Sequence, residues 1–114
     1  MARIGERVIT DNWLRDPDDP SNKNKTGYFG SERHGGFAEY TTIPAVNAIP
    51  VDSDFTDAEM ATFSCSYSTA EGMLSRANVT NLDTVLVPGA SGGVGGALVQ
   101  LAKRRRARVI AMAS

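Results

Sequence analysis

The feature that most constrains this chain is a glycine-rich turn at residues 89–95, which lies between an apolar stretch and an amphipathic one. Before the turn, Thr84–Val87 is β-branched and apolar, as expected of a buried parallel strand. After the turn, apolar residues recur at helical spacing and form one face, made of Val94, Ala97, Leu98, Leu101 and Ala102. A second strand candidate follows at Arg108–Met112. This order predicts a βαβ unit over residues 84–114, the context in which such a turn binds a dinucleotide.

The turn has the spacing Ala90-x-Gly92-x-x-Gly95, with alanine at the first glycine position. Glycine reaches the backbone conformations of a tight turn without Cβ strain, and it lets phosphates approach the backbone closely. Free amides and the helix dipole then favour an anion at the helix start, and Gly95 would let the helix pack tightly on the strand. The alternative is a structural glycine turn in another α/β fold. We expect the cofactor pyrophosphate to bind at six residues: Ala90, Ser91, Gly92, Gly93, Val94 and Gly95.

The first part of the chain favours β structure around a polar excursion. Residues 11–35 are rich in turn formers, and we interpret them as a surface loop. Its Asp16, Asp18 and Asp19 could bind a hard cation, but their spacing matches no calcium loop, and we interpret them as solvated charges. The single histidine, His34, is interpreted as a solvated loop side chain, with a proton shuttle or a metal ligand as the alternative. Three segments are strand candidates: Glu6–Thr10, Phe37–Ile43 and Asn47–Val51.

Two capping-box patterns predict helices before the glycine turn. Thr56 followed by Glu59 predicts a short helix that ends near Phe63. Ser68 followed by Glu71 repeats the pattern and predicts the start of a second helix. On that second helix one face would carry four apolar residues, Ala70, Met73, Leu74 and Ala77.

Composition excludes several other classes of protein. The 114 residues carry a formal net charge of −1, so no global field favours nucleic acid or an anionic membrane. No apolar run approaches the ~18–20 residues of a transmembrane helix, and the first residues lack the apolar core of a signal peptide. The basic run Lys103–Arg106 lies at a predicted helix C-terminus, where cations complement the dipole. Cys65 is the only cysteine, which fits a reducing compartment, and we expect a cytoplasmic protein without nucleic-acid or membrane partners.

Three motifs in order resemble one known family. Gly5-Glu6-Arg7-Val8 resembles its Gly-Asp/Glu-Arg-Val strand, and Gly36–Tyr40 resembles its Gly-Phe-Ala-Glu-Tyr strand. Val85–Gly95, followed by Val99–Lys103, resembles its cofactor motif. The family is the medium-chain dehydrogenase/reductase superfamily, with its zinc-type alcohol dehydrogenases and quinone oxidoreductase-like enzymes.

The resemblance implies an α/β chain that is a fragment of a longer protein. Residues 1–62 would be the C-terminal part of a GroES-like, β-rich catalytic domain. Residues 63–114 would start a dinucleotide-binding Rossmann domain with its first βαβ unit. Two positions depart from the family pattern: Pro88 removes a backbone donor at a strand end, and Arg106 stands where a glycine is usual.

The resemblance also implies further site residues. Cys65 precedes Thr69-Ala70 in a C-x-x-x-T-A pattern, in which zinc-type members have a zinc-ligand cysteine and Thr69 would lie at the cofactor. A buried, unreactive cysteine is the alternative. The polar loop holds no cysteine, so the four-cysteine zinc lobe of some members is absent from it. Ala113 and Ser114 follow the last strand where NAD-preferring enzymes have an acidic residue, so NADP(H) is expected, with Ser114 as a donor to its 2′-phosphate.

Two hypotheses for function follow. The first is an NAD(P)-dependent oxidoreductase, zinc-type or zinc-free, that moves hydride between nicotinamide and a small-molecule carbonyl, alcohol or enone substrate. The resemblance implies that the whole enzyme is a homo-oligomer. The catalytic residues stay unknown, because this segment carries no motif for them. The second hypothesis is a truncated, non-catalytic remnant of such an enzyme that no longer binds the cofactor.

Overall fold

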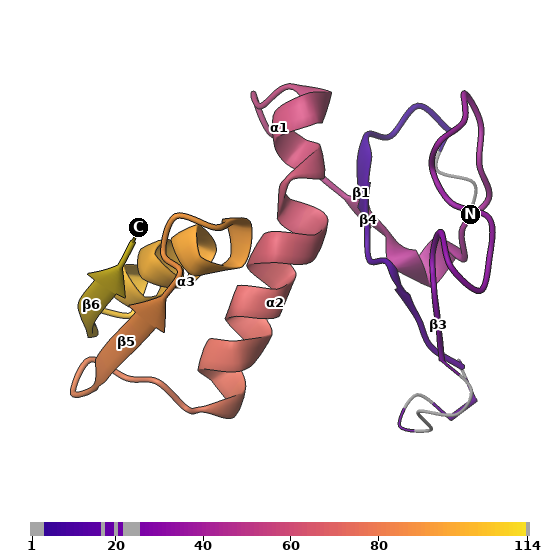
Figure 1. The fold of residues 1–114 in the computed structure, drawn as a ribbon. Coiled ribbons are helices and arrows are strands. Elements are labelled where there is room, and N and C mark those ends of the chain that lie inside the picture. Colours follow the sequence, from indigo (N-terminus) through magenta and orange to yellow (C-terminus); the bar gives the residue numbers. More distant parts are fainter. Residues whose placement is uncertain (1–3, 17, 20, 22–25, 114) are drawn as a thin grey trace. The chain divides into compact units, whose positions relative to one another are not determined.

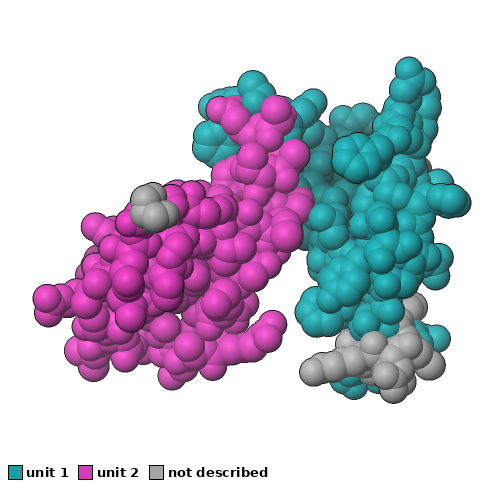
Figure 2. Space-filling model, in the orientation of Figure 1, with its two compact units in different colours: residues 1–57 teal, residues 58–114 magenta. Residues whose placement is uncertain are grey.

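The computed structural model describes residues 4–16, 18–19, 21 and 26–113. The chain divides into two compact units, Met1–Asp57 and Ala58–Ser114, which Figure 2 draws in two colours. The domain boundary expected after residue 62 lies slightly later than this division, and the assignment of the two domains stays a prediction. Within the described ranges, no helix has the length and apolar character needed to cross a membrane.

Among its described residues, the first unit contains two antiparallel strand pairs (Figure 1). These are β1 (Val8–Thr10) with β4 (Ala48–Pro50), and β2 (Trp13–Leu14) with β3 (Gly27–Tyr28). A 3-10 helix, Ala45–Asn47, leads into β4, and Asn47 is buried. The Asn47 side-chain amide donates to the carbonyls of Asp11 at 2.9 Å and Trp13 at 3.0 Å. This one side chain therefore connects the segment before β4 to Asp11, which lies between β1 and β2, and to the start of β2.

The strand predictions in this unit are confirmed in two places and wrong in a third. β1 and β4 lie within the expected strands Glu6–Thr10 and Asn47–Val51. The segment Phe37–Ile43 forms no strand, and the side chains of Phe37 and Tyr40 are fully exposed. An apolar pattern favours a strand only where another strand satisfies its backbone groups, and no described strand pairs with this segment.

Two consecutive helices precede the glycine-rich turn. α1 (Asp57–Ala61) begins directly after Thr56, as the first capping box predicts, and α2 spans Phe63–Arg76. The second predicted start is wrong, because Ser68 lies inside α2. Its hydroxyl donates to the Ser64 carbonyl at 2.7 Å, a bond within the helix that competes with any capping role.

The expected apolar face of α2 forms only in part. Ala70 and Leu74 are buried with 0% and 2% exposure, whereas Met73 and Ala77 are exposed. Residues four apart lie on one line along a helix, so the buried stripe is narrower than the sequence pattern indicates. With this stripe α2 packs along the next helix, α3 (Gly93–Arg104).

The predicted βαβ unit is present, with close to the expected bounds. β5 (Thr84–Pro88) leads through the turn into α3 (Gly93–Arg104), and β6 (Arg108–Met112) pairs with β5 in parallel (Figure 1). β5 ends at Pro88, and beyond it the Ala90 amide donates to the Met112 carbonyl of β6 at 2.8 Å. The core of this unit is a cluster of apolar residues from both helices and both strands: Leu74, Ala102 and Ala107, with Val79, Val85, Leu98, Leu101 and Val109 packed against it.

A polar contact ties the C-terminal halves of α2 and α3 together. Arg105 forms an ion pair with Glu71, and its Nη1 donates to the second carboxylate oxygen at 3.1 Å. The hydrogen bond from Arg105 is the main reason that the pKa of Glu71 lies below its ordinary value. The pair is partly exposed, so it orients the two helices more than it stabilises them.

Both long helices end in the same way, with a non-glycine residue in the left-handed conformation. After α3, Arg106 has φ of 62°, its amide donates to the Lys103 carbonyl, and the Ala107 amide donates to the Ala102 carbonyl at 3.1 Å. This pair of bonds is a Schellman motif. The expectation that Arg106 takes the place of a C-terminal glycine is confirmed by its positive φ.

Arg106→Gly should therefore stabilise the C-terminal unit by about 1 kcal/mol. Glycine adopts the left-handed conformation without Cβ strain, which outweighs its larger entropy loss on folding. Thermal or urea unfolding would measure the change. Lys103→Gly is the matched control, because Lys103 lies inside α3, where glycine costs about 1 kcal/mol. A lower stability for Arg106→Gly would contradict the prediction.

Candidate functional site

The site is the turn between β5 and α3, where the chain reverses direction within four residues. Gly89 has φ of 67°, a conformation that favours glycine. The Gly92 amide donates to the Gly89 carbonyl at 3.0 Å, and the Gly96 amide donates to the Gly92 carbonyl at 2.7 Å. Gly92 itself is extended, with φ of −78° and ψ of 164°, so it is the last residue before the helix. The turn is thus closed by its own backbone hydrogen bonds.

The glycines of the turn have different structural roles. A Cβ on Gly95 would lie 2.1 Å from the Gly89 carbonyl oxygen, so the first turn of α3 rests directly on the end of β5. A Cβ on Gly92 would meet nothing closer than 3.4 Å, which leaves its surroundings open to a ligand. A Cβ on Gly93 would lie 2.9 Å from the Ser66 hydroxyl of α2. Gly95 therefore serves packing, and Gly92 offers the open approach that phosphates need.

The start of α3 can hold an anion. Gly93, Val94 and Gly95 are its first residues, and within the described ranges their amides donate to no protein acceptor. Their free N–H groups and the positive end of the helix dipole act in the same direction. Ser91 and Gly92 are exposed beside them, and Ala90 is half-buried. The structure thus brings the six predicted turn residues together around unpaired donors, while their role in cofactor binding stays a prediction.

The other predicted site residues are less closely connected to the turn. Cys65 and Thr69 lie one helical turn apart on α2, and both are exposed. Ser114 lies outside the described residues. Among the residues that the structure describes, no three His, Cys, Asp or Glu side chains are grouped as a metal site would require. Cys65 alone therefore does not fit a zinc ion on this chain.

Ser66 is the residue that the sequence analysis missed. It neighbours Gly93, as the short Cβ distance shows, and it lies on the same stripe of α2 as the buried Ala70. The sequence pattern predicts a helix that starts only at Ser68, so it places Ser66 outside any helix and predicts no contact between Ser66 and the turn. Three serines in alternation, Ser64, Ser66 and Ser68, carry no signal that distinguishes one from another.

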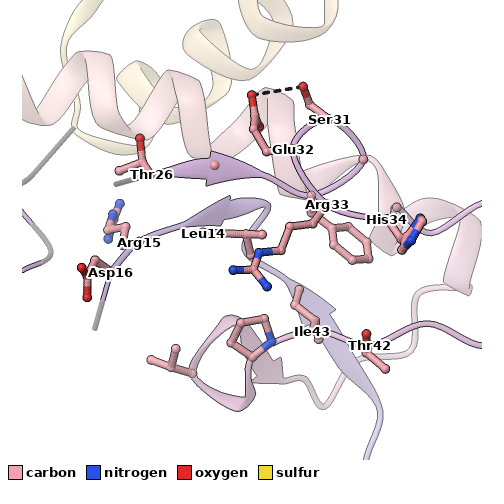
Figure 3. A pocket seen from close by; sticks show the side chains of 16 residues that line it. Leu14, Arg15, Asp16, Thr26, Ser31, Glu32, Arg33, His34, Thr42 and Ile43 are labelled. Carbon is pink, nitrogen blue, oxygen red and sulfur yellow. Dashed lines mark hydrogen bonds between the residues drawn. The ribbon is translucent and has the colours of Figure 1, made fainter. Parts of the chain in front are cut away.

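The first unit has an open groove of its own, with a volume of about 1340 Å³ (Figure 3). Its walls come from the strands and loops around Leu14, Arg33 and Ile43. Glu32 is held at its edge, where the carboxylate accepts the Tyr28 amide at 2.6 Å. This backbone hydrogen bond is the main cause that lowers the pKa of Glu32. The groove is lined by residues of the first unit alone and contains no predicted site residue, although His34 contributes to its wall.

Alanine substitutions at the neighbouring Gly95 and Gly96 distinguish the close helix–strand contact from the helix propensity of glycine. Gly95→Ala should destabilise the C-terminal unit by about 3 kcal/mol or more, because its Cβ would overlap backbone atoms that cannot move aside. Gly96→Ala is the matched control, since its Cβ would lie 3.6 Å from the Ala90 carbonyl oxygen, an ordinary contact. It should be neutral or stabilising by up to about 1 kcal/mol. Equal unfolding midpoints for the two variants would contradict the close approach at Gly95.

The known proteins that this chain resembles are dehydrogenases and reductases. No family model matches the chain. A Sinorhizobium meliloti 1021 crystal structure assigned to the alcohol dehydrogenases is 51% identical and has a TM-score of 0.85, with 98% of this chain and 31% of that chain covered. Curated relatives, alcohol dehydrogenases among them, are 31–39% identical. The chain spans only 24–34% of their length.

Two further solved structures were determined with bound cofactors or metals. The quinone oxidoreductase of Thermus thermophilus, solved also with NADPH, is 34% identical with a TM-score of 0.68, and 78% of this chain covers 29% of it. A cobalt- and zinc-bound alcohol dehydrogenase of Pyrobaculum aerophilum is 32% identical with a TM-score of 0.83, and 94% of this chain covers 35% of it. The likeness extends over most of this sequence in each case, so the chain belongs to the zinc-type medium-chain dehydrogenase/reductase superfamily.

Proposed function

We propose that the protein is an NAD(P)-dependent oxidoreductase that transfers hydride between nicotinamide and a carbonyl, alcohol or enone. The observation that carries this proposal is the turn between β5 and α3. It combines a left-handed Gly89, an unhindered Gly92 and free amides at the helix start. In this proposal residues 1–62 belong to a GroES-like catalytic domain and residues 63–114 begin a Rossmann domain. The family membership, with its dehydrogenase and reductase relatives, supports the reaction class.

The residues of this chain fit the pyrophosphate of a dinucleotide. The amides of Gly93 and Val94 would donate to phosphate oxygens, and the missing side chain of Gly92 leaves room for them. The bound cofactor supplies the hydride chemistry, while the protein binds and orients it. Gly95 and Gly89 contribute indirectly, because their close contact fixes the angle at which α3 presents its amides.

We propose a zinc ion only for the whole protein and not for this chain alone. A catalytic zinc site uses three protein ligands and one open position. Cys65, exposed on α2, would be one of the three. The described residues supply no partners for it, so no step of the reaction is assigned to a metal here. The zinc-type and the zinc-free forms of the enzyme are separated by metal analysis of the whole protein.

We further propose that the cofactor is NADP(H) rather than NAD(H). NAD-preferring enzymes place an acidic residue at the end of the second strand, where it accepts a hydrogen bond from the ribose 2′-hydroxyl. In this chain β6 ends at Met112 and the exposed Ala113 follows. No carboxylate at that position repels a 2′-phosphate. Ser114, the last residue, is proposed to donate a hydrogen bond to it.

Gly92→Val should weaken binding of NADPH by at least about tenfold, which is about 1.4 kcal/mol. The backbone of Gly92 is one that valine adopts readily, so the variant should fold, while its branched side chain would occupy the approach of the phosphates. Titration calorimetry on the whole protein would measure the dissociation constant. Unchanged affinity in a folded variant would contradict the phosphate site. Absence of saturable binding to the unsubstituted protein would instead indicate a remnant without cofactor binding.

The cofactor preference predicts a larger kcat/KM for NADPH than for NADH at fixed salt concentration. Ala113→Asp should shift this ratio toward NADH, because the carboxylate repels the 2′-phosphate and accepts from the ribose hydroxyl. Ala113→Asn is the matched control, with a similar shape and no charge. A preference for NADH in the unsubstituted protein would overturn the proposal.

A further inference from the structure

One side chain of α2 lies at the start of α3 without taking part in the packing core. Ser66 is on the stripe of α2 that continues through Ala70 and Leu74, both of which are buried. Ser66 itself is only partly buried. It occupies the end of the stripe that meets Gly93, the first residue of α3. The position of Ser66 is therefore fixed by the packing of the two helices, while its hydroxyl is still accessible.

The contact between Ser66 and Gly93 depends on the hydroxyl. A Cβ at position 93 would lie 2.9 Å from the Ser66 Oγ but 3.7 Å from the Ser66 Cβ. The first distance is too short for a real contact, and the second is an ordinary one. An alanine at position 93 would thus be compatible with the α2 backbone and would displace only the Ser66 hydroxyl. Glycine at position 93 keeps that hydroxyl beside the first turn of α3.

The hydroxyl of Ser66 has an unused hydrogen-bonding capacity. Helical serines often donate to a carbonyl of the preceding turn, and Ser68 does so, with the Ser64 carbonyl at 2.7 Å. In the part of the chain that the structure describes, the Ser66 hydroxyl makes no hydrogen bond. A hydroxyl can donate one hydrogen bond and accept others. It is therefore available to a ligand at the same place as the free amides of α3.

We infer that Ser66 is a further cofactor-binding residue, whose hydroxyl donates to an oxygen of the pyrophosphate at the start of α3. This inference rests on the proposed dinucleotide site. It adds a donor from α2 to the backbone donors of α3, so two helices hold the phosphates. It also gives Gly93 a specific role, which is to leave space for the hydroxyl of Ser66.

The test measures dissociation constants for NADPH in the whole protein, together with unfolding midpoints. Ser66→Ala should weaken binding about tenfold, the effect of losing one hydrogen bond to a charged group. Gly93→Ala should weaken it to a similar extent, because its methyl group displaces the same hydroxyl. The double variant should bind no more weakly than either single variant. Ser68→Ala is the matched control and should bind like the unsubstituted protein, since its hydroxyl is bonded within α2.

A second probe locates the contact on the cofactor. 2′-Phospho-ADP-ribose keeps the pyrophosphate but lacks nicotinamide, so Ser66→Ala should weaken its binding by the same factor. Loss with NADPH alone would overturn the assignment to the pyrophosphate. Unchanged affinity in a folded Ser66→Ala variant, or additive losses in the double variant, would overturn the inference and leave the dinucleotide site intact. Failure of the unsubstituted protein to bind either probe would overturn the proposed function itself.

Discussion

The backbone of the first turn of α3 rests on the carbonyl group of Gly89, and the C-terminal unit depends on this contact. Because position 95 has no side chain, the helix starts immediately beside the end of β5. Its apolar face then lies over the strand, which buries Val87, Ala97 and Ala102. The same geometry returns the chain so that β6 pairs with β5 in parallel. A side chain at position 95 would separate helix and strand and expose this small core.

The ends of α2 and α3 complete the unit by a shared local device. At each end a residue with positive φ, Asn78 or Arg106, turns the chain back onto its own helix. The amides of Val79 and Ala107 then donate to the carbonyls of Leu74 and Ala102, and all four side chains meet in the core. The chain is thus directed toward β5 after one helix and toward β6 after the other. Asn tolerates this conformation better than Arg does, so the cost of the device is larger after α3.

Prediction succeeded where the determining contacts are close in sequence. The glycine turn, α3 and both parallel strands are specified by local spacing, and the bounds of the two strands agree with the structure within one residue. The unit before them depends on distant partners. β1 pairs with β4 near the end of that unit, and the buried Asn47 fixes the carbonyls of Asp11 and Trp13. No local pattern predicts such distant contacts. The local pattern of Phe37–Ile43 therefore favours a strand that the structure does not contain.

The sequence by itself determined the βαβ unit through the local spacing of its apolar residues. It also determined the close approach at Gly95 and the left-handed Arg106, because both follow from backbone sterics within a few residues. Only the tertiary structure decided which serine of α2 meets the turn. Ser64, Ser66 and Ser68 are alike in sequence, and helix start and packing direction distinguish them. Because α2 starts at Phe63, Ser66 lies inside the helix and on the same stripe as Ala70 and Leu74. Burial of those two residues against α3 therefore brings the hydroxyl of Ser66 to Gly93. The packing of α2 against α3 therefore decides which serine hydroxyl lies at the turn, and no local pattern distinguishes the three serines.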